Sequence, residues 1–424
     1  MWFGQRGFSQ QSRPAAVLDV GSHKICCLIG SPQLSSARED GLRLKLLGYA
    51  SRQAEGVSGG QIADMNAAEM SIRRTIAEAE KMADLVVERV YVTSSAGQSG
   101  ERLTAKVPLP SGVAEKDHIA QAVDAVRRDA ASQGKVALHT HPMTFAIGAE
   151  RGIRDPCGMA GDSLRVDLHS IFASTSPLSN LKLCLQRSHI EFAGFCIGGY
   201  ASALSVLNAS EANAGAVVID MGADTTSFVA LRGGRMVYAD CIKSGGARIT
   251  DDLADVFALT RSEAERLKTL HGGVMSGPED EGGIIMLPIS AKRGETWISL
   301  NKLEVSAVVR RRQEAVFVGL AERWQKAEGL SSQSQIILTG GASQLLGAAP
   351  LAERLFKAPV RIAAPPAFFK GPSPVIGPEF AAASGLLGHV HREDWSVDFS
   401  LSARSAQPES GYISRVGDWL WQGF

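Results

Sequence analysis

Two aspartates, Asp19 and Asp220, lie 201 positions apart within two similar segments of the chain. Residues 15–24 read AAVLDVGSHK and residues 216–226 read AVVIDMGADTT, each an apolar run that ends in Asp, any residue and Gly. The Gly lets backbone N–H groups approach an anion, and the Asp can hold Mg²⁺ through water. This spacing is too long for a solenoid repeat and indicates a duplicated domain. Two such turns facing each other would form a nucleotide clamp.

The residues after each aspartate are candidates for binding metal and phosphate. Asp19 and Asp220 would face Mg²⁺, with water between them and the ion. Phosphate oxygens would accept hydrogen bonds from amides and hydroxyls of Gly21, Ser22, His23, Gly222, Thr225 and Thr226. Lys24 would offset phosphate charge, although a solvated strand end explains it equally well. His23 would donate to phosphate or lie at the surface of its turn.

A third glycine motif, LTGGAS at 338–343, also follows an apolar run. We expect a helix to start directly after it, with backbone N–H groups that hold an adenine–sugar–phosphate edge. The residues expected on this side of a nucleotide are Gly340, Gly341 and Ala342, with Gly245 and Gly246 of KSGGARIT lining the same cleft. One strand–glycine–helix turn is weak evidence, because many α/β folds contain it. The three motifs in this order and spacing are far more specific.

Glu265 and Lys268 in SEAERLK would share one face of a helix. A surface ion pair is the ordinary explanation of this spacing. Because the pair follows the second phosphate turn, it is also a candidate for contact with a ribose or adenine.

Length and composition predict a folded protein with more than one domain. The chain has 424 residues, which is too long to fold around a single hydrophobic core. Its residues are 45% hydrophobic and 21% charged, as in a folded protein. Its 44 basic and 44 acidic residues cancel, which argues against general nucleic-acid binding. The six cysteines, like His139, His141 and His169, have no metal-ligand spacing and are expected to be structural. The first residues lack the apolar core of a signal peptide, and no apolar run could span a bilayer.

The order of the expected elements predicts an α/β fold built from two similar halves. In each half, a strand with an Asp-x-Gly turn leads into hairpin strands, and helices follow. Residues 99–174 read as a compact α+β insert around a helix at 115–131. Later helices are expected at 248–258, 261–270 and about 303–328. Five prolines within 365–378 indicate a loop, and AAASGLLGHV after them reads as a last core helix.

Residues 411–424, GYISRVGDWLWQGF, form a separate amphipathic pattern. As a helix they place apolar side chains on one face and tryptophans on its flanks: Ile413, Val416, Leu420 and Phe424, with Trp419 and Trp421. This segment is too short to span a membrane, and indole rings suit the headgroup boundary, so we expect an interfacial helix. The alternative is a helix docked on its own domain or in a partner groove. A polar linker at 391–410 indicates a tethered segment rather than a core element, and the paired tryptophans favour the membrane.

Together, these motifs resemble the FtsA family of bacterial cell-division proteins, within the actin-like ATPase superfamily. AAVLDVGSHK and VVIDMGADTT are similar to the family's two phosphate motifs, YASALSVL to its connecting helix and ILTGGAS to its adenosine motif. GVSGGQIADM, LHTHPMTF with GIRDPCGMAG, and ERLKTLHGG resemble stretches peculiar to the family. The resemblance runs from about residue 15 to 424. It implies a two-lobed actin-like fold of duplicated, ribonuclease-H-like halves.

The resemblance also implies a division into subdomains. Subdomain 1A would comprise 14–98 and 175–212, the inserted subdomain 1C 99–174, subdomain 2A 213–242 and 336–390, and subdomain 2B 243–335. A disordered head at 1–13, the linker at 391–410 and a membrane-targeting helix at 411–424 would complete the chain.

For function, the resemblance implies ATP and Mg²⁺ between the lobes, and actin-like filaments on the cytoplasmic face of the inner membrane at the septum. It implies that the protein tethers FtsZ there, and that other divisome proteins bind subdomain 1C. The C-terminal peptide of FtsZ would dock on subdomain 2B, near Lys302, Arg310, Arg311 and Arg312. A basic groove suits an acidic peptide. A solvated helix face explains these cations equally well.

Two further points qualify this expectation. The family's tail is usually rich in Lys and Arg, whereas here Arg415 is balanced by Asp418, so attraction to anionic lipid should be weaker. We identify no residue in the sequence whose motif assigns it to position an attacking water. We therefore expect the protein to bind ATP and to hydrolyse it slowly or negligibly. The alternative function is a small-molecule kinase on the same fold, which would need an acidic general base. A pilus-assembly or rod-shape actin homologue would differ in the insert and the tail.

Overall fold

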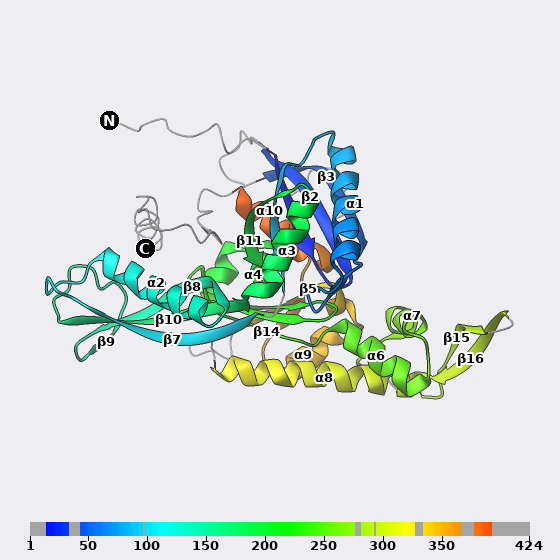
Figure 1. The fold of residues 1–424 in the computed structure, drawn as a ribbon. Coiled ribbons are helices and arrows are strands. Elements are labelled where there is room, and N and C mark those ends of the chain that lie inside the picture. Colours follow the sequence, from blue (N-terminus) through cyan, green and yellow to red (C-terminus); the bar gives the residue numbers. More distant parts are fainter. Residues whose placement is uncertain are drawn as a thin grey trace.

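The computed structural model describes residues 14–33, 43–95, 98–275, 281–291, 294–326, 334–365 and 377–391. The predicted head, the membrane-targeting helix at 411–424 and nearly all of the linker lie outside these residues. Within the described residues, two five-stranded sheets repeat one plan, and a smaller sheet is inserted into the first half (Figure 1).

The N-terminal sheet has the order β11-β6-β1-β2-β3. Its strands are β1 (Ala15–Val20), β2 (Lys24–Gln33), β3 (Arg43–Gln53), β6 (Arg89–Ser94) and β11 (Glu191–Ile197). β1 is antiparallel to β2 and parallel to β6. Both faces of β1 are buried: Leu18 belongs to the core beneath α1 (Met65–Ala83), and Val17 belongs to a second core beneath α10 (Ala381–Val390). Such burial on both faces explains the unbroken apolar run.

The C-terminal sheet repeats this order as β18-β17-β12-β13-β14. Its strands are β12 (Ala216–Met221), β13 (Thr226–Arg232), β14 (Arg235–Ile242), β17 (Gln335–Thr339) and β18 (Val360–Ile362). β12 is antiparallel to β13 and parallel to β17, as β1 is to β2 and β6. The predicted duplication is therefore confirmed strand by strand, and the fold is the expected two-lobed α/β fold.

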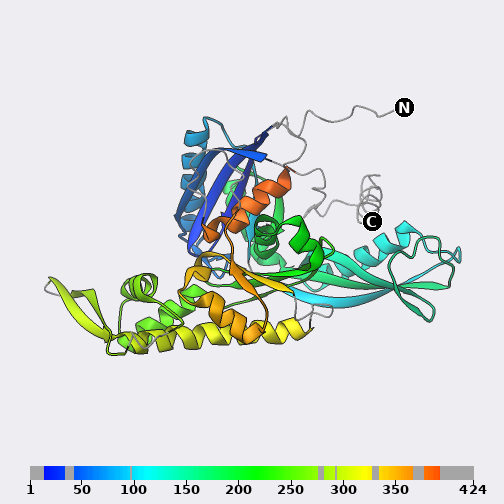
Figure 2. The ribbon, with the colours of Figure 1, turned by 180° about the vertical axis from the view of Figure 1, so that it is seen from behind.

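Helices cover both sheets. In the first half these are α1 and α3 (Thr175–Arg187), with α4 (Gly198–Val206) after β11. The short helix α5 (Ala209–Ala214) contacts β12 and β13 of the C-terminal sheet. In the second half the helices are α6 (Gly246–Phe257), α7 (Arg261–His271), α8 (Lys302–Lys326), α9 (Ala348–Phe356) and α10. Asp64 begins α1 because its carboxylate accepts hydrogen bonds from the amides of Asn66 and Ala67. Figure 2 shows the long helix α8 along one side of the molecule.

α4 and α10 cross between the two lobes. α10 follows β18 of the C-terminal sheet, yet Ala383, Leu386 and Leu387 pack in the core of the N-terminal sheet. The sequence-based boundary assigned 336–390 to subdomain 2A, whereas this packing places α10 against the first sheet. At the crossing, a Cβ on Gly385 would lie 1.8 Å from the carbonyl oxygen of Ala201, so the two helix backbones touch directly.

Two excursions leave this duplicated core at opposite ends of the molecule (Figures 1 and 2). The inserted sheet has the order β7-β10-β8-β9 and is covered by α2 (Lys116–Ser132). Its strands are β7 (Ser99–Pro108), β8 (Lys135–Ile147), β9 (Glu150–Ile153) and β10 (Ser163–Ser174). The other excursion holds the hairpin of β15 (Ile284–Ala291) and β16 (Gly294–Asn301).

One local prediction was wrong. No α-helix starts directly after LTGGAS, because Gly341–Gln344 form a 3₁₀ turn and α9 begins only at Ala348. Gly340 and Gly347 both have positive φ, 83° and 82°, so the backbone bends twice before the helix.

Candidate functional site

The two predicted aspartates occupy equivalent places at the ends of the central strands. Asp19 on β1 pairs in register with Thr93 of β6, and Asp220 on β12 pairs with Thr339 of β17. Burial raises the pKa of Asp19 to about 7, against the opposing charge of Lys24 and with a smaller contribution from Asp220. Burial also raises the pKa of Asp220. The carboxylates therefore lie in one buried site and would gain from a nearby cation.

Lys24 supplies a buried positive charge to this site. Its Nζ atom is buried and has no hydrogen-bond partner among the described residues. It lies 3.6 Å from the centroid of the Phe380 ring, and its charge lowers the pKa of both Asp19 and Asp220. This placement contradicts the alternative of a solvated strand end. An ammonium group without a hydrogen-bond acceptor fits an anionic ligand such as phosphate.

The turns after the two aspartates have the same backbone geometry. The amide of Gly21 donates to the carbonyl of Lys24 at 3.1 Å, and the amide of Gly222 donates to the carbonyl of Thr225 at 2.9 Å. Thr226, also a predicted phosphate residue, is instead buried, with its hydroxyl donating to the carbonyl of Ser244 at 2.7 Å. His23 is exposed at the tip of the first turn.

The predicted adenosine motif closes against the second aspartate. Gly340 has φ 83°, and a Cβ there would lie 2.3 Å from Oδ1 of Asp220, so only glycine fits. The amide of Gly340 donates to the carbonyl of Pro378 at 3.1 Å, which brings in the segment that leads to Phe380. Gly341 lies beside Glu379, because its Cβ would be 3.7 Å from the Cβ of that residue.

The KSGGARIT glycines join the same group. The amide of Gly246 donates to the carbonyl of Gly222 at 3.0 Å, and a Cβ on Gly245 would lie 2.4 Å from the carbonyl oxygen of Ala223. A Cβ on Gly246 would lie 3.2 Å from the Cβ of Ala342. The second phosphate turn, the start of α6 and the adenosine motif are therefore in contact.

Glu265 and Lys268 form more than a surface ion pair. Lys268 Nζ donates to Glu265 Oε2 at 2.7 Å, to Thr250 Oγ1 at 2.9 Å and to the carbonyl of Gly246 at 3.1 Å. Burial pushes the pKa of Glu265 upward, but hydrogen bonds from Lys268 and Thr250 outweigh it and leave that pKa lowered. The network ties α7 to the start of α6, next to the adenosine motif.

Ser202 was missed as a site residue in the sequence. It is fully buried on α4, and its hydroxyl donates to Oδ2 of Asp220 at 2.6 Å. This bond lowers the pKa of Asp220 against the effect of burial. The signal was YASALSVL, which resembled a connecting helix. Nothing local in that motif shows which residue its serine reaches.

The sequence reasoning also missed a glycine turn beside the phosphate motifs. Gly59 and Gly60 join β4 (Val57–Ser58) to β5 (Gln61–Ile62). The amide of Gly60 donates to Ser22 Oγ at 2.8 Å, and the amide of Gly59 donates to Asp224 Oδ2 at 2.6 Å. Its signal was the Gly-Gly pair in GVSGGQIADM, which predicts a tight turn but not its partners.

The structure separates the four cations expected to bind a partner on α8. Arg312 forms a bidentate ion pair with Asp252 of α6, at 2.6 and 2.7 Å. Arg310 donates to the carbonyl of Val274 at 2.7 Å. Arg311 is exposed, and Lys302 is half-buried at the start of the helix. Two of the four side chains therefore hold α8 to its own neighbours.

The histidines of the insert are structural, as expected. Burial lowers the pKa of His139 to about 3, and the pKa values of His141 and His169 to about 4. His169 Nε2 accepts a hydrogen bond from the amide of Ala239 on β14 at 2.9 Å. The neutral ring thereby joins the insert to the C-terminal sheet.

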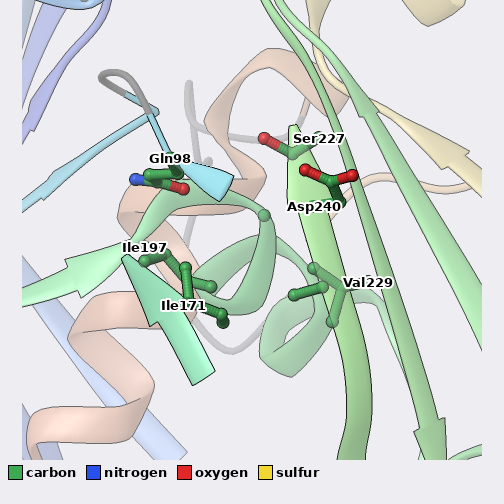
Figure 3. Close-up of a pocket in the computed structure, with 8 residues that line it drawn as sticks. Gln98, Ile171, Ile197, Ser227, Val229 and Asp240 are labelled. Atoms are coloured by element: carbon green, nitrogen blue, oxygen red, sulfur yellow. The ribbon is translucent and has the colours of Figure 1, made fainter. Parts of the chain in front are cut away.

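A narrow crevice marks this junction of the insert with both lobes. Figure 3 shows Gln98 and Ile171 from the insert, Ile197 from β11, Ser227 and Val229 from β13, and Asp240 from β14. Asp240 is also paired with Arg323 of α8. The crevice is a packed seam, and the residues of the glycine turns described above are not among those that line it.

Neither a metal cluster nor a membrane span is found in the part of the chain that the structure describes. No group of three or more His, Cys, Asp or Glu side chains there could hold a metal ion. No helix among the described residues is both long and apolar enough to cross a membrane. A Mg²⁺ ion between Asp19 and Asp220 would therefore need ligands from phosphate and water as well.

Solved structures with this fold include actin-like proteins. A PilM–PilN type IV pilus biogenesis complex matches with a TM-score of 0.63 at 18% identity, over 89% of this chain and 98% of that one. MreB5 of Spiroplasma citri bound to ADP matches with a TM-score of 0.51 at 13% identity, over 90% and 98%. These similarities show the fold alone: a two-lobed actin-like α/β fold.

Sequence comparisons identify the family. The model of cell division protein FtsA matches residues 217–385, and that of the SHS2 domain inserted in FtsA matches 96–172. The cell division protein FtsA of Agrobacterium fabrum is 34% identical over 98% of this chain and 96% of its own length. That of Rhizobium meliloti is 33% identical over 98% and 96%, and that of Escherichia coli K12 26% identical over 96% and 97%. The chain belongs to the FtsA family of cell division proteins.

Proposed function

We propose that the chain binds ATP with Mg²⁺ between its two lobes. The observation that carries this proposal is the convergence of Asp19, Asp220 and the buried ammonium group of Lys24 at duplicated glycine turns. Two carboxylates with raised pKa values suit a cation, and an ammonium group without a hydrogen-bond acceptor suits phosphate. Mg·ATP supplies both charges at once.

Each part of the nucleotide has a matching part of the site. Asp19 and Asp220 would hold Mg²⁺ through water, and Lys24 would bind a phosphate oxygen. The amides of Ser22, His23 and Thr225, with nearby hydroxyls, would bind the remaining phosphate oxygens. The amides of Gly21 and Gly222 already donate within their own turns and shape them for this contact. Gly340, Gly341, Ala342 and Gly245, with Glu265 and Lys268, would line the adenosine side.

Hydrolysis is proposed to be slow at most. Both aspartates are proposed to hold the metal, and Glu265 is hydrogen-bonded to Lys268 and Thr250. None of these three carboxylates is therefore assigned as the general base that would activate an attacking water. Phosphate release and ADP release, both measured with and without candidate sugars, distinguish this proposal from a small-molecule kinase, because a kinase releases ADP while its phosphoryl group goes to the sugar. Rapid sugar-dependent release of ADP would contradict the adaptor function.

In the cell, we propose an ATP-dependent adaptor on the cytoplasmic face of the inner membrane at the septum. Its filaments would tether FtsZ, whose C-terminal peptide would dock near Arg311 and Lys302, and its insert would recruit later divisome proteins. The helix at 411–424 would bind the membrane. One short interfacial helix binds weakly, so a filament that presents many copies would supply avidity.

Electron microscopy on lipid monolayers, with and without ATP, tests the core of this proposal. Wild-type protein should form filaments with ATP, and Asp220→Ala should lose nucleotide binding and filaments together. Asp162→Ala, which removes an exposed carboxylate of the insert, serves as the matched control. Filaments of Asp220→Ala in the absence of bound nucleotide would refute a nucleotide-dependent assembly.

A further inference from the structure

We infer that Asp224 is a positioning residue that holds the two phosphate turns together across the cleft, through the Gly59–Gly60 turn. This inference rests on the proposed nucleotide site. Asp224 lies in the second phosphate turn, whereas Gly59 belongs to the N-terminal lobe, 165 residues earlier in the chain. The bond of 2.6 Å between Asp224 Oδ2 and the Gly59 amide therefore joins the lobes at the site itself.

The Gly59–Gly60 turn is built to offer two amides outward. Both glycines have positive φ, 57° and 71°, as in a two-residue hairpin turn between β4 and β5. The Gly59 amide donates a hydrogen bond to Asp224 of the second phosphate turn. The Gly60 amide donates one to Ser22 Oγ of the first, at 2.8 Å. One tight turn is thus hydrogen-bonded to both phosphate turns of the duplicated site.

The turn is also fixed firmly to its own lobe. Ser94, at the end of β6, donates its hydroxyl to the carbonyl of Gly60 at 3.0 Å. Gly56, just before β4, packs so closely on α1 that a Cβ there would lie 2.5 Å from the amide of Ala68. Because the turn cannot easily follow a departing partner, separation of the lobes at this point must break the bond to Asp224.

The contact has a second, electrostatic side. A carboxylate in a phosphate-binding turn would repel the nucleotide if it faced the phosphates. In this structure the half-buried carboxylate is directed to the Gly59 amide of the opposite lobe. A charge-assisted bond of this kind is worth more than a neutral one. Its loss should lower the fraction of chains with both turns in place and weaken apparent affinity by that fraction.

The test compares full-length wild type with Asp224→Ala and Asp224→Asn. Asparagine keeps an oxygen acceptor for the Gly59 amide without the charge, and alanine removes both. Affinity for Mg·ATP is measured by titration, and hydrogen exchange is followed in peptides that cover 57–62. Glu55→Ala removes one exposed carboxylate close to the same hairpin and serves as the charge control.

We expect Asp224→Ala to bind Mg·ATP roughly ten-fold more weakly and to exchange faster at 57–62, since bonds to charged groups are among the stronger ones. Asp224→Asn should stay within about three-fold of wild type on affinity, since its amide oxygen still accepts. Tighter binding by both variants would show that Asp224 is only a repelling charge, and unchanged affinity and exchange in Asp224→Ala would show no positioning role. Either result overturns the inference.

Failure of the proposed function gives a different result. If wild type does not bind Mg·ATP at all, nucleotide binding is refuted, while hydrogen exchange without ligand still tests the contact. Asp224→Ser, whose side chain is too short to reach the Gly59 amide, replaces Asp224→Ala if that variant does not fold. Slow exchange at 57–62 in Asp224→Ser would then refute the contact.

Discussion

The two central aspartates have equivalent positions and different surroundings. Asp220 accepts a hydrogen bond from Ser202 of the connecting helix, and this bond lowers its pKa against the effect of burial. For Asp19, the charge of Lys24 opposes burial, and the pKa is nevertheless raised to about 7. Duplication therefore produced one motif twice, and packing then gave the two copies different hydrogen-bond and charge partners.

The raised pKa of Asp19 predicts a pH dependence of stability. In the unfolded chain this carboxyl has its ordinary pKa of 3.8, whereas the folded chain keeps the proton until about pH 7. The folded chain therefore binds more protons in this window, and its free energy of unfolding should fall as the pH rises from about 4 to 7. Asp19→Asn, measured by urea unfolding at several pH values, should lack this slope. A difference between wild type and variant that does not change with pH contradicts the raised pKa.

Removal of the Lys24 charge should act on the nucleotide. Lys24→Met keeps most of the side-chain volume and removes the buried ammonium group that is available to phosphate. We expect affinity for Mg·ATP to fall by roughly ten- to a hundred-fold, because a buried charge-assisted contact is lost. Lys45→Met, on the exposed face of β3, is the control and should bind as wild type. Equal affinity of the two variants for Mg·ATP would show that Lys24 does not contribute to nucleotide binding.

At the scale of elements, α8 combines two kinds of basic side chain. Arg312 is half-exposed in a bidentate pair with Asp252, and Arg311 faces solvent. Arg312→Ala should lower the free energy of unfolding by about 1 kcal/mol, because the pair joins α8 to α6. Arg311→Ala should leave stability unchanged and weaken binding of the FtsZ C-terminal peptide. Calorimetric unfolding and peptide titration of both variants check these two expectations. An unchanged peptide affinity in Arg311→Ala would show that the peptide does not dock at Arg311.

The element scale also shows what the sequence can predict. The strands that carry Asp19 and Asp220 are visible because buried β-branched runs and glycine turns have strong local patterns. The 3₁₀ turn after Gly341 was missed because two glycines with positive φ delay the helix. Ser202 and Asp224 were missed for another reason. Their partners lie on other elements, and only the folded chain brings them together.

At the scale of the whole molecule, the proposed membrane anchor and the proposed nucleotide site share no residues. Residues 411–424 lie outside the described residues, so the prediction for them depends on sequence. Deletion of 411–424 should abolish liposome co-sedimentation and leave Mg·ATP affinity unchanged, because the site is complete without this segment. Trp419→Ala with Trp421→Ala should weaken liposome binding in the same direction. Unchanged co-sedimentation of the truncated chain would refute the anchor.

The close crossing of α4 and α10 has a mechanical consequence. Each helix belongs to one half of the chain by sequence and rests on the other half, and at Gly385 the backbones meet with no side chain between them. A Cβ on Gly385 would collide with the carbonyl oxygen of Ala201, so any other residue there has to push the two helices apart. Because α10 packs on the N-terminal sheet and α4 also contacts the C-terminal sheet, a single added methyl group at this crossing is expected to disturb both lobes at once.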